Sequence, residues 1–110
     1  MVKVKILGQN LIGKKEIKMN KIKIITTKDC EACNILVQNA KEAVATTSKN
    51  VELIIKDKDD VNPKWLKANR IREYPTILVM EDDAILSRKT GCYPAIVLLR
   101  WIDIHFKLKK

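Results

Sequence analysis

The sequence predicts a single α/β domain built around a mixed β-sheet, and three observations support this prediction. First, a chain of 110 residues, 46% of them hydrophobic and only three each glycine and proline, can bury one core. Second, β-patterned runs at 22–27 and 51–55 flank a helical pattern, and such a strand–helix–strand unit has parallel strands. Third, the runs at 76–80 and 84–88 are separated by three acidic residues, which predicts an antiparallel hairpin.

Two further helices complete the predicted order of elements. Asn62-Pro63 is typical of the start of a short helix, because proline is tolerated in the first turn. Apolar residues recur at helical spacing around much of 95–107, which predicts a closing helix. Residues 102–108 also alternate between apolar and polar, a pattern that favours a strand when this tail is taken alone. We expect the helix, because one face of the predicted sheet needs a cover.

The N-terminal region differs from the rest of the chain in its charge. The net charge is +9, and residues 1–28 hold eight lysines against the single acid Glu16, a balance of +7. The alternation at 2–7 predicts a half-buried strand followed by a loop, so we divide the chain into a basic extension at 1–20 and a domain at 21–110. A basic arm can bind nucleic acid, although a solvated strand face is the favoured interpretation.

No segment of the sequence suggests a membrane or secretory location. The longest uninterrupted apolar run, 95–99, is too short to span a bilayer. Lysines interrupt the apolar residues at 2–7, where a signal peptide would have its apolar core. The sequence therefore predicts a cytoplasmic protein, in which three cysteines are better explained by chemistry than by a structural disulfide.

Cys30 and Cys33 are separated by two residues at the predicted junction between the strand 22–27 and the following helix. This placement in an α/β chain predicts a dithiol redox site. The unpaired N–H groups and the dipole of a helix start stabilise a thiolate, and the spacing lets the two sulfurs close a disulfide. The alternatives are two inert core thiols, or a zinc site, which normally needs a second ligand pair that this sequence lacks.

The helical pattern predicts different environments for the two sulfurs. Cys33 falls on the same side as Leu36 and the other apolar residues of the stripe, so it should be the less exposed sulfur. Cys30 should lie at the helix tip and act as the attacking nucleophile. Asp29 and Glu31 flank Cys30, and their charges disfavour its thiolate, opposing the helix dipole. We therefore expect a reducing couple and not an oxidising one.

The order of the predicted elements and the position of the redox pair resemble the thioredoxin family over residues 21–107. Cys30 and Cys33 match the redox pair of that family. The segment 71–76 is similar to the one that carries the family's cis-proline, which would be Pro75. The resemblance implies a thioredoxin fold, with a central mixed sheet of βαβ and ββα halves flanked by helices.

The resemblance also implies a substrate-binding surface. A cis bond before Pro75 would leave the backbone of Tyr74 facing the cysteines, where an extended substrate peptide can pair with it. Gly91 matches the glycine that lets partner proteins approach the disulfide. Cys92 follows this glycine and should lie near the redox pair. A role as a small residue is the favoured interpretation of Cys92, and a regulatory thiol is the alternative.

Some positions depart from the thioredoxin pattern. Ile24 stands where the family has a buried aspartate, and isoleucine cannot take a proton. Lys56 matches the lysine that usually neighbours that aspartate, so we expect water or Lys56 to support proton removal from Cys33. Asp29 stands where thioredoxins usually have tryptophan, and Glu-Ala replaces Gly-Pro between the two cysteines.

These features lead to three hypotheses. The first is a thiol–disulfide oxidoreductase that reduces protein disulfides through Cys30 and Cys33, with no cofactor beyond this redox-active pair. Its electron donor would be a thioredoxin reductase or, in a glutaredoxin-like variant, glutathione. The second is a thioredoxin-fold binding module whose basic arm docks on nucleic acid or on another protein. The third is a metal site formed by both cysteines together with Cys92 and His105.

Overall fold

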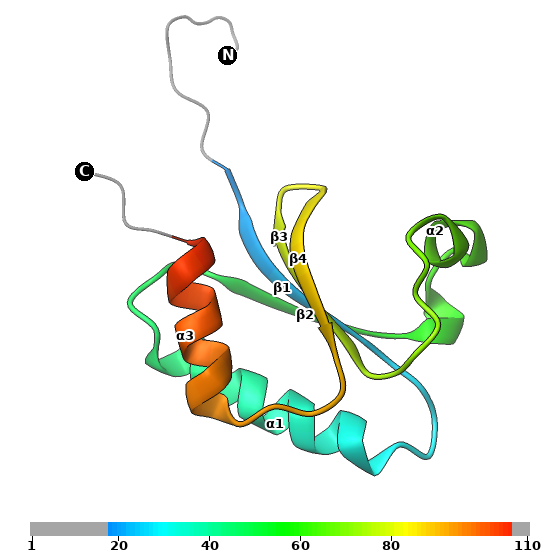
Figure 1. Ribbon diagram of the computed structural model, residues 1–110, viewed down its shortest axis with the longest axis horizontal. Helices are drawn as coiled ribbons and strands as arrows, with labels where there is room; N and C mark the ends of the chain where they lie inside the picture. The colour runs from blue at the N-terminus through cyan, green and yellow to red at the C-terminus, as the bar shows by residue number, and fades with distance from the viewer. Residues whose placement is uncertain (1–17, 107–110) are drawn as a thin grey trace, which may run out of the picture.

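The computed structural model describes residues 18–106 and shows a four-stranded sheet with helices on both faces (Figure 1). The sheet has the strand order β2-β1-β3-β4. The predicted mixed α/β architecture is therefore confirmed. In chain order the elements are β1 (Asn20–Thr26), α1 (Glu31–Thr46), β2 (Glu52–Asp57), the 3-10 turn η1 (Lys58–Asp60), α2 (Pro63–Ala68), β3 (Thr76–Glu81), β4 (Ala84–Thr90) and α3 (Ala95–His105).

The pairing of the strands follows the predicted βαβ and ββα halves. β1 and β2 are parallel neighbours joined through α1, while β1 pairs antiparallel with β3, and β3 pairs antiparallel with β4. β1 therefore lies inside the sheet. Its three isoleucines are buried, as suits a strand inside the sheet, whereas Lys21 and Lys23 are only partly buried. This central position brings the end of β1, and the redox motif that follows it, between the ends of two neighbouring strands.

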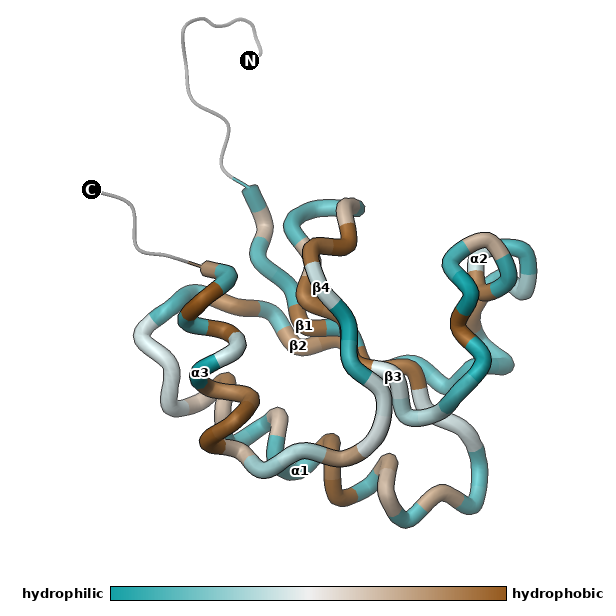
Figure 2. Tube along the Cα trace, viewed as in Figure 1, coloured by the Kyte–Doolittle hydropathy of each residue, from teal (hydrophilic) through white to brown (hydrophobic). Residues whose placement is uncertain are grey.

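The larger core lies between the sheet and the pair α1 and α3. Figure 2 shows hydrophobic segments along α1, α3 and the strands around this layer. Alternate residues of β1 point into it, as expected from the two-residue period of a strand. Trp101 closes this core from α3, and its indole N–H donates to the Ser87 hydroxyl at 3.3 Å. The buried members are Ile22, Ile24, Leu36, Ala40, Ala43, Ile77, Val79, Leu98, Trp101, Ile102 and Phe106.

A smaller cluster lies on the opposite face, under α2. Its buried members are Ile71, Leu78 and Met80, and Trp65 packs against them from α2. The Lys23 ammonium lies 4.8 Å from the centre of the Trp65 ring. Burial chiefly, and then the nearby positive charges of Lys56 and Lys21, lower the pKa of Lys23, while Asp83 acts in the opposite direction. The apolar cluster on this face of the sheet is thus smaller than the core under α1 and α3, and its surroundings are more polar.

The described elements settle the ambiguous C-terminal tail but not the N-terminal extension. Residues 102–105, which also carried a strand pattern, belong to α3, and the helix ends at His105 instead of 107. Trp101 and Ile102 are both buried in the larger core, and this packing explains why the segment forms a helix and not a strand. The predicted strand at 2–7 and its loop lie outside the described residues. Within residues 18–106, the helices are too short or too polar to cross a membrane.

Candidate redox site

Four strand ends meet at one edge of the sheet. Thr26, the last residue of β1, pairs with Asp57 at the end of β2. Ile25 pairs with Thr76 at the start of β3, and Thr76 pairs with Thr90 at the end of β4. The segments that carry the predicted redox pair, the proline and the glycine continue directly from these ends. The fold therefore brings residues that are far apart in the sequence to one edge.

Cys30 and Cys33 form a disulfide at the first turn of α1, with their Cα atoms 5.2 Å apart. Cys30 is the N-cap residue, and its Sγ accepts a hydrogen bond from the Cys33 backbone N–H at 3.0 Å. A helix start has unpaired N–H donors, so the same contact would stabilise a thiolate at Cys30 when the disulfide is reduced. Asp29, directly before the helix, has a positive φ of 53°, a conformation that aspartate adopts more readily than most residues.

The two sulfurs differ in exposure in the predicted order. The Cys33 side chain is buried, with 2% of its surface exposed, whereas Cys30 is half-buried. The buried stripe of α1 explains this difference, because Cys33 occupies its first position, followed by Leu36, Ala40 and Ala43. A bulky substrate disulfide can reach only a sulfur that is open to solvent. Cys30 is therefore the more accessible of the two sulfurs.

Pro75 and Gly91 are joined at the same edge. The Tyr74–Pro75 peptide bond, predicted to be cis, is cis in the structure. The Gly91 N–H donates to the Pro75 carbonyl oxygen at 2.9 Å, which fixes the end of β4 beside the loop that precedes β3. Gly91 has a φ of 93°, where a side chain would be strained. β3 begins at Thr76, so the backbone of Tyr74 lies outside the sheet ladder.

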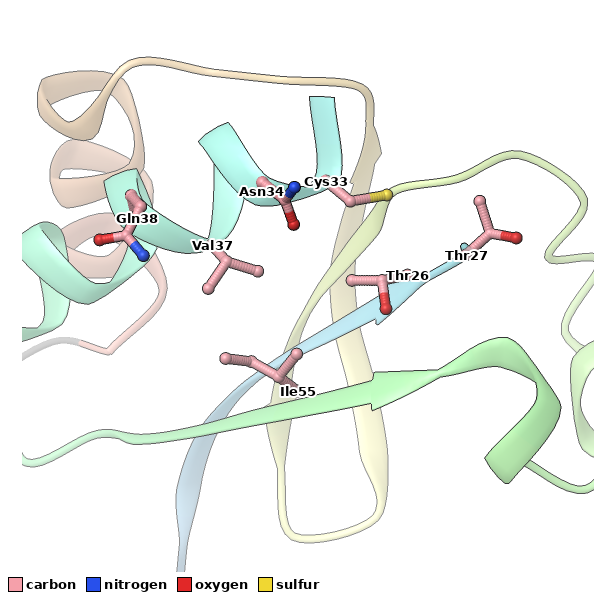
Figure 3. A pocket seen from close by; sticks show the side chains of 7 residues that line it. All are labelled: Thr26, Thr27, Cys33, Asn34, Val37, Gln38 and Ile55. Carbon is pink, nitrogen blue, oxygen red and sulfur yellow. The ribbon is translucent and has the colours of Figure 1, made fainter. Parts of the chain in front are cut away.

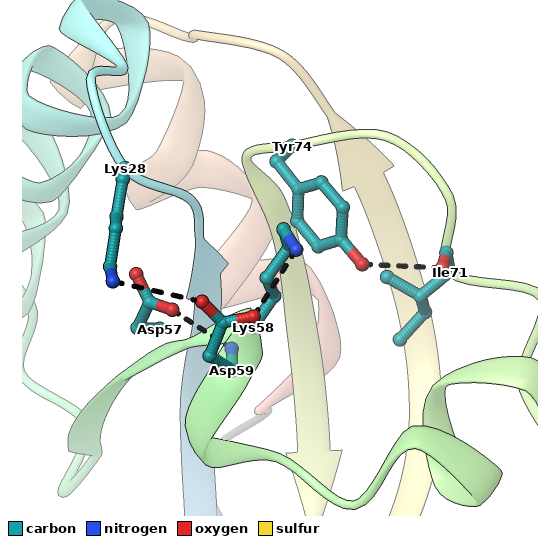
Figure 4. Close-up of polar contacts among 6 residues, drawn as sticks. All are labelled: Lys28, Asp57, Lys58, Asp59, Ile71 and Tyr74. Atoms are coloured by element: carbon teal, nitrogen blue, oxygen red, sulfur yellow. Dashed lines mark hydrogen bonds and ion pairs between the residues drawn. The ribbon is translucent and has the colours of Figure 1, made fainter.

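Exposed ion pairs gather at η1 (Figure 4). Asp59 lies 3.9 Å from the Lys28 ammonium and 3.2 Å from that of Lys58. The Asp59 backbone N–H donates to the Asp57 carboxylate at 2.8 Å. Because these side chains are largely exposed, each ion pair stabilises the fold by less than about 1 kcal/mol. Their main consequence is positional, since Lys28 links the segment before the redox pair to η1.

A hollow of about 300 Å³ lies beside Cys33, between α1 and the ends of β1 and β2. Figure 3 shows the Cys33 side chain and the polar side chains of Thr26 and Asn34 around this space. Ile55, at its lower wall, is 41% exposed, so the hollow opens to solvent. Its lining residues are Thr26, Thr27, Cys33, Asn34, Val37, Gln38 and Ile55. A solvent-open space with polar walls therefore adjoins the buried Cys33 on this side.

Sequence reasoning did not find this hollow. The available signal was the polar pair Asn34 and Gln38, which are four residues apart on one side of α1 and adjoin the buried stripe. Such a pair is ordinary on an exposed helix face. Only the pairing of β1 with β2, which sets Thr26 across from this part of α1, indicates that the polar groups surround a common space.

The register places Lys56 on the face of the sheet away from Cys33. The parallel ladder pairs Ile24 with Ile55, the residue before Lys56, and successive side chains of a strand point to opposite faces. Ile24 points into the core under α1 and α3, so Lys56 projects toward the α2 face, on the side of Lys23. The predicted supporting role of the Lys56 ammonium at Cys33 therefore lacks a geometric basis.

Cys92 is an exposed free thiol in the connection between β4 and α3. Its neighbours hold the backbone on both sides. Gly91 donates to Pro75, as described above, and the Asn39 side-chain amide of α1 donates to the Tyr93 carbonyl at 2.9 Å. The connection therefore runs from the proline loop to α1. This path ties the Cys92 segment to the residues around Pro75, and the nearness of Cys92 to the redox pair stays a prediction.

The residues of the metal hypothesis do not come together. Cys30 and Cys33 are joined in the disulfide, and Cys92 is exposed in the loop before α3. His105 lies at the other end of α3, where its ring meets the edge of Trp101 at a centroid distance of 6.0 Å. In the described part of the chain, His, Cys, Asp and Glu form no group of three or more that could hold a metal ion.

Solved thioredoxin structures resemble this fold at low sequence identity. Thioredoxin-2, a component of malaria parasite protein secretion machinery, has a TM-score of 0.70 and 20% identity, and the match covers 94% of this chain and 100% of that one. Chloroplastic thioredoxin z has a TM-score of 0.63 and 24% identity, with 78% and 77% covered. A mutant thioredoxin from Halobacterium salinarum has a TM-score of 0.69 and 16% identity, with 83% and 78% covered.

The sequence itself matches no protein-family model and no curated protein. The structural matches therefore establish the fold, which is thioredoxin-like, with a Cys-x-x-Cys disulfide at the start of its first helix. The predicted resemblance is confirmed at this level.

Proposed function

We propose that the protein is a thiol–disulfide oxidoreductase that reduces disulfides of other proteins. The observation that carries this proposal is the environment of the two sulfurs. Cys30 Sγ caps α1 and accepts the Cys33 N–H at 3.0 Å, while Cys33 is buried beside it. An N-cap position favours the thiolate, which is the nucleophile in thiol–disulfide exchange.

The proposed cycle transfers two electrons to the substrate. The Cys30 thiolate attacks one sulfur of a substrate disulfide, forming a mixed disulfide and releasing the other substrate sulfur as a thiolate. Cys33 loses its proton and attacks Cys30 Sγ, which breaks the mixed disulfide and releases the second substrate thiolate. Both substrate sulfurs are then reduced, and Cys30 and Cys33 are oxidised to their disulfide. A thioredoxin reductase or glutathione returns two electrons to this disulfide, so no organic cofactor is needed.

The second step requires a proton acceptor for Cys33. Ile24 is completely buried and Lys56 lies toward the other face, so neither side chain supplies one. We assign this role to water in the hollow beside Cys33, where Thr26, Asn34 and Gln38 offer polar partners. A buried thiol next to a solvent-open polar space can lose its proton without a dedicated carboxylate.

The substrate-binding surface is proposed to consist of Tyr74, Pro75 and Gly91. The Tyr74 backbone lies beyond the end of β3, so an extended peptide can add to this edge through main-chain hydrogen bonds. Backbone pairing reads little of the peptide's sequence, which suits a reductase with several protein substrates. Because the cycle consumes reducing equivalents, we propose that the protein acts in a reducing compartment such as the cytoplasm.

Reduction of insulin driven by dithiothreitol tests the proposal. The parent protein should accelerate insulin precipitation, and either Cys30→Ser or Cys33→Ser should reduce turnover to the uncatalysed rate. Cys92→Ala is the matched cysteine control and should retain the activity. The same preparations should be tested for bound zinc. Failure of the parent to accelerate the reaction, or full activity of Cys30→Ser, would refute the proposal.

A further inference from the structure

A second hollow, of about 240 Å³, lies next to the proposed substrate surface and is rich in arginine. Its lining residues are Arg70, Arg72, Glu73, Arg88 and Thr90. Three of its five lining residues are therefore arginines, and Glu73 is the one acidic residue among them. Within residues 18–106, none of the three arginines forms an ion pair. All three are exposed, so the positive charge is available to a partner.

Arg88 is fixed in this hollow by the end of α2. Its two terminal nitrogens donate to the carbonyl oxygens of Asn69 and Arg70, the second at 2.8 Å. Carbonyl groups at a helix end lack partners within the helix, so an arginine from β4 satisfies them. A guanidinium group has five N–H donors, and these two contacts leave three of them for an anion. The Arg88 side chain is thus held in place before any ligand arrives.

The loop after α2 presents the other two arginines beside it. Arg70 has a φ of 56°, a left-handed conformation that turns the chain after the helix. Arg72 follows on the same loop, which then reaches Glu73. The Glu73 carbonyl accepts the Thr76 hydroxyl at 2.6 Å, so the loop is tied to the start of β3. The arginines are therefore held beside the end of β4 by the turn at Arg70, by the two hydrogen bonds of Arg88 and by the Thr76–Glu73 hydrogen bond.

The hollow adjoins the proposed substrate surface in two places, at the loop before β3 and at the end of β4. Glu73 directly precedes Tyr74, and Thr90 directly precedes Gly91. A peptide that pairs with the Tyr74 backbone would therefore carry neighbouring side chains toward the arginines. The volume is below the roughly 300–1,000 Å³ of typical small-molecule sites, and suits one or two side chains better than a free cofactor.

We propose that this hollow, defined by Arg70, Arg72 and Arg88, binds an acidic side chain next to the disulfide of the substrate protein. The ligand class is a carboxylate of Asp or Glu in an extended segment, because guanidinium groups bind carboxylates through paired N–H donors. The identity of this ligand as a substrate rests on the proposed function. The preference for acidic segments is inferred from the residues of the hollow alone. It can therefore be measured as binding, without redox chemistry.

Binding of redox-inert peptides tests the proposal. Two extended peptides with serine in place of cysteine should differ only in an Asp-Glu pair or an Asn-Gln pair. The acidic peptide should bind the parent protein about fivefold more tightly at low salt. NMR should show the arginine N–H resonances shifting on its addition. The preference should shrink at 0.5 M salt, because screening acts on exposed charges.

Charge-matched variants locate the effect. Arg72→Gln should remove about two- to fivefold of the preference, and Arg72→Lys should retain part of it. Lys41→Gln, on the exposed side of α1, removes the same charge and should leave the preference unchanged. Arg88 is left intact because it also supports the end of α2. Equal binding of the two peptides, or an equal loss in Lys41→Gln, would overturn the proposal. Tighter binding of a DNA oligonucleotide of equal charge would also overturn it.

A disulfide-containing version of each peptide separates this inference from the proposed function. Faster reduction of the acidic peptide by the parent, with a smaller difference between the two rates in Arg72→Gln, is the expected result. If neither peptide is reduced although the acidic one binds preferentially, the proposed function fails and the acidic site remains. If both are reduced at equal rates and bind equally, the function stands and the acidic site is refuted.

Discussion

Replacing Ile24 by aspartate puts a proton acceptor into the strand that precedes the redox pair. Ile24 is completely buried, and in the sheet it lies between Ile55 and Ile77. It is two residues before Thr26, which lines the hollow beside Cys33 and points to the same face. The introduced carboxyl would therefore lie in the core just below that hollow. The strand register places Lys56 on the other face of the sheet, so its ammonium does not pair with the introduced carboxylate.

The size of the effect on stability follows from this burial. Loss of the isoleucine side chain from a tight core costs about 2–5 kcal/mol, and the polar group adds a further penalty unless it is hydrogen-bonded. Burial raises the pKa of an introduced carboxyl, so the folded state binds its proton more tightly than the unfolded state. Stability should then fall as pH rises from about 4 to the raised pKa. Each tenfold gain in the proton affinity of the folded state corresponds to a loss of about 1.4 kcal/mol across this range.

Urea unfolding at several pH values measures this loss, and Ile24→Asn is the matched neutral control. Both variants should be destabilised near pH 4, and only Ile24→Asp should lose further stability between pH 4 and pH 7. A small domain has only about 5–15 kcal/mol of stability, so circular dichroism must first show that each variant is folded. Identical pH dependence in the two variants would refute the inferred burial of position 24.

The same pair of variants tests how Cys33 loses its proton. Resolution of a preformed mixed disulfide should be faster in folded Ile24→Asp than in Ile24→Asn above pH 7, because a carboxylate accepts protons better than water. The rate is followed by release of a chromogenic thiol. An unchanged rate–pH profile would show that proton removal from Cys33 does not limit this step.

Two further predictions concern residues outside the disulfide. Cys92→Ala should retain full reductase activity but lose sensitivity to brief peroxide or glutathione disulfide treatment, because an adduct on the exposed Cys92 thiol would obstruct the surface next to Gly91; equal inactivation of variant and parent would exclude a regulatory role. Lys23→Met should raise stability at pH 7 by no more than about 1 kcal/mol, because burial disfavours the Lys23 charge while its contact with Trp65 offsets part of that penalty. The pKa of Lys23 is lower in the folded state than in the unfolded state, so the stability of the parent should approach that of the variant as pH rises toward 10.5, the unperturbed value. A difference in stability that does not change with pH would contradict this explanation.

The sequence predicted the elements that depend on local pattern. The apolar stripe that begins at Cys33 gave both the helix and the burial of that sulfur, and Asn62-Pro63 marked the start of α2. Within the described residues 18–106, the predicted strands matched the observed ones within one or two residues. The tail at 102–108 was ambiguous because its helical and strand patterns overlap. Packing of Ile102 against the sheet decides it, and that contact is not local in sequence.

The features that the sequence did not predict depend on register and on long-range contacts. Lys56 matched a family position, but only the pairing of Ile24 with Ile55 shows that its side chain lies toward the other face. The arginine-lined hollow could not be anticipated either. Arg72 and Arg88 are sixteen residues apart in the sequence, and the return of β4 beside the loop after α2 brings them together.

Trapping of mixed disulfides tests the roles of the two sulfurs most directly. The Cys33→Ser variant is incubated with a disulfide-containing protein such as insulin, and covalent adducts are identified by mass spectrometry without reductant. If Cys30 is the attacking sulfur and Cys33 resolves the intermediate, Cys33→Ser accumulates an adduct through Cys30. Both variants also carry Cys92→Ala, so that the exposed Cys92 thiol cannot form adducts. Cys30→Ser should then form none, because the remaining sulfur at position 33 is buried. Adducts in Cys30→Ser at the level of Cys33→Ser would contradict the proposed cycle.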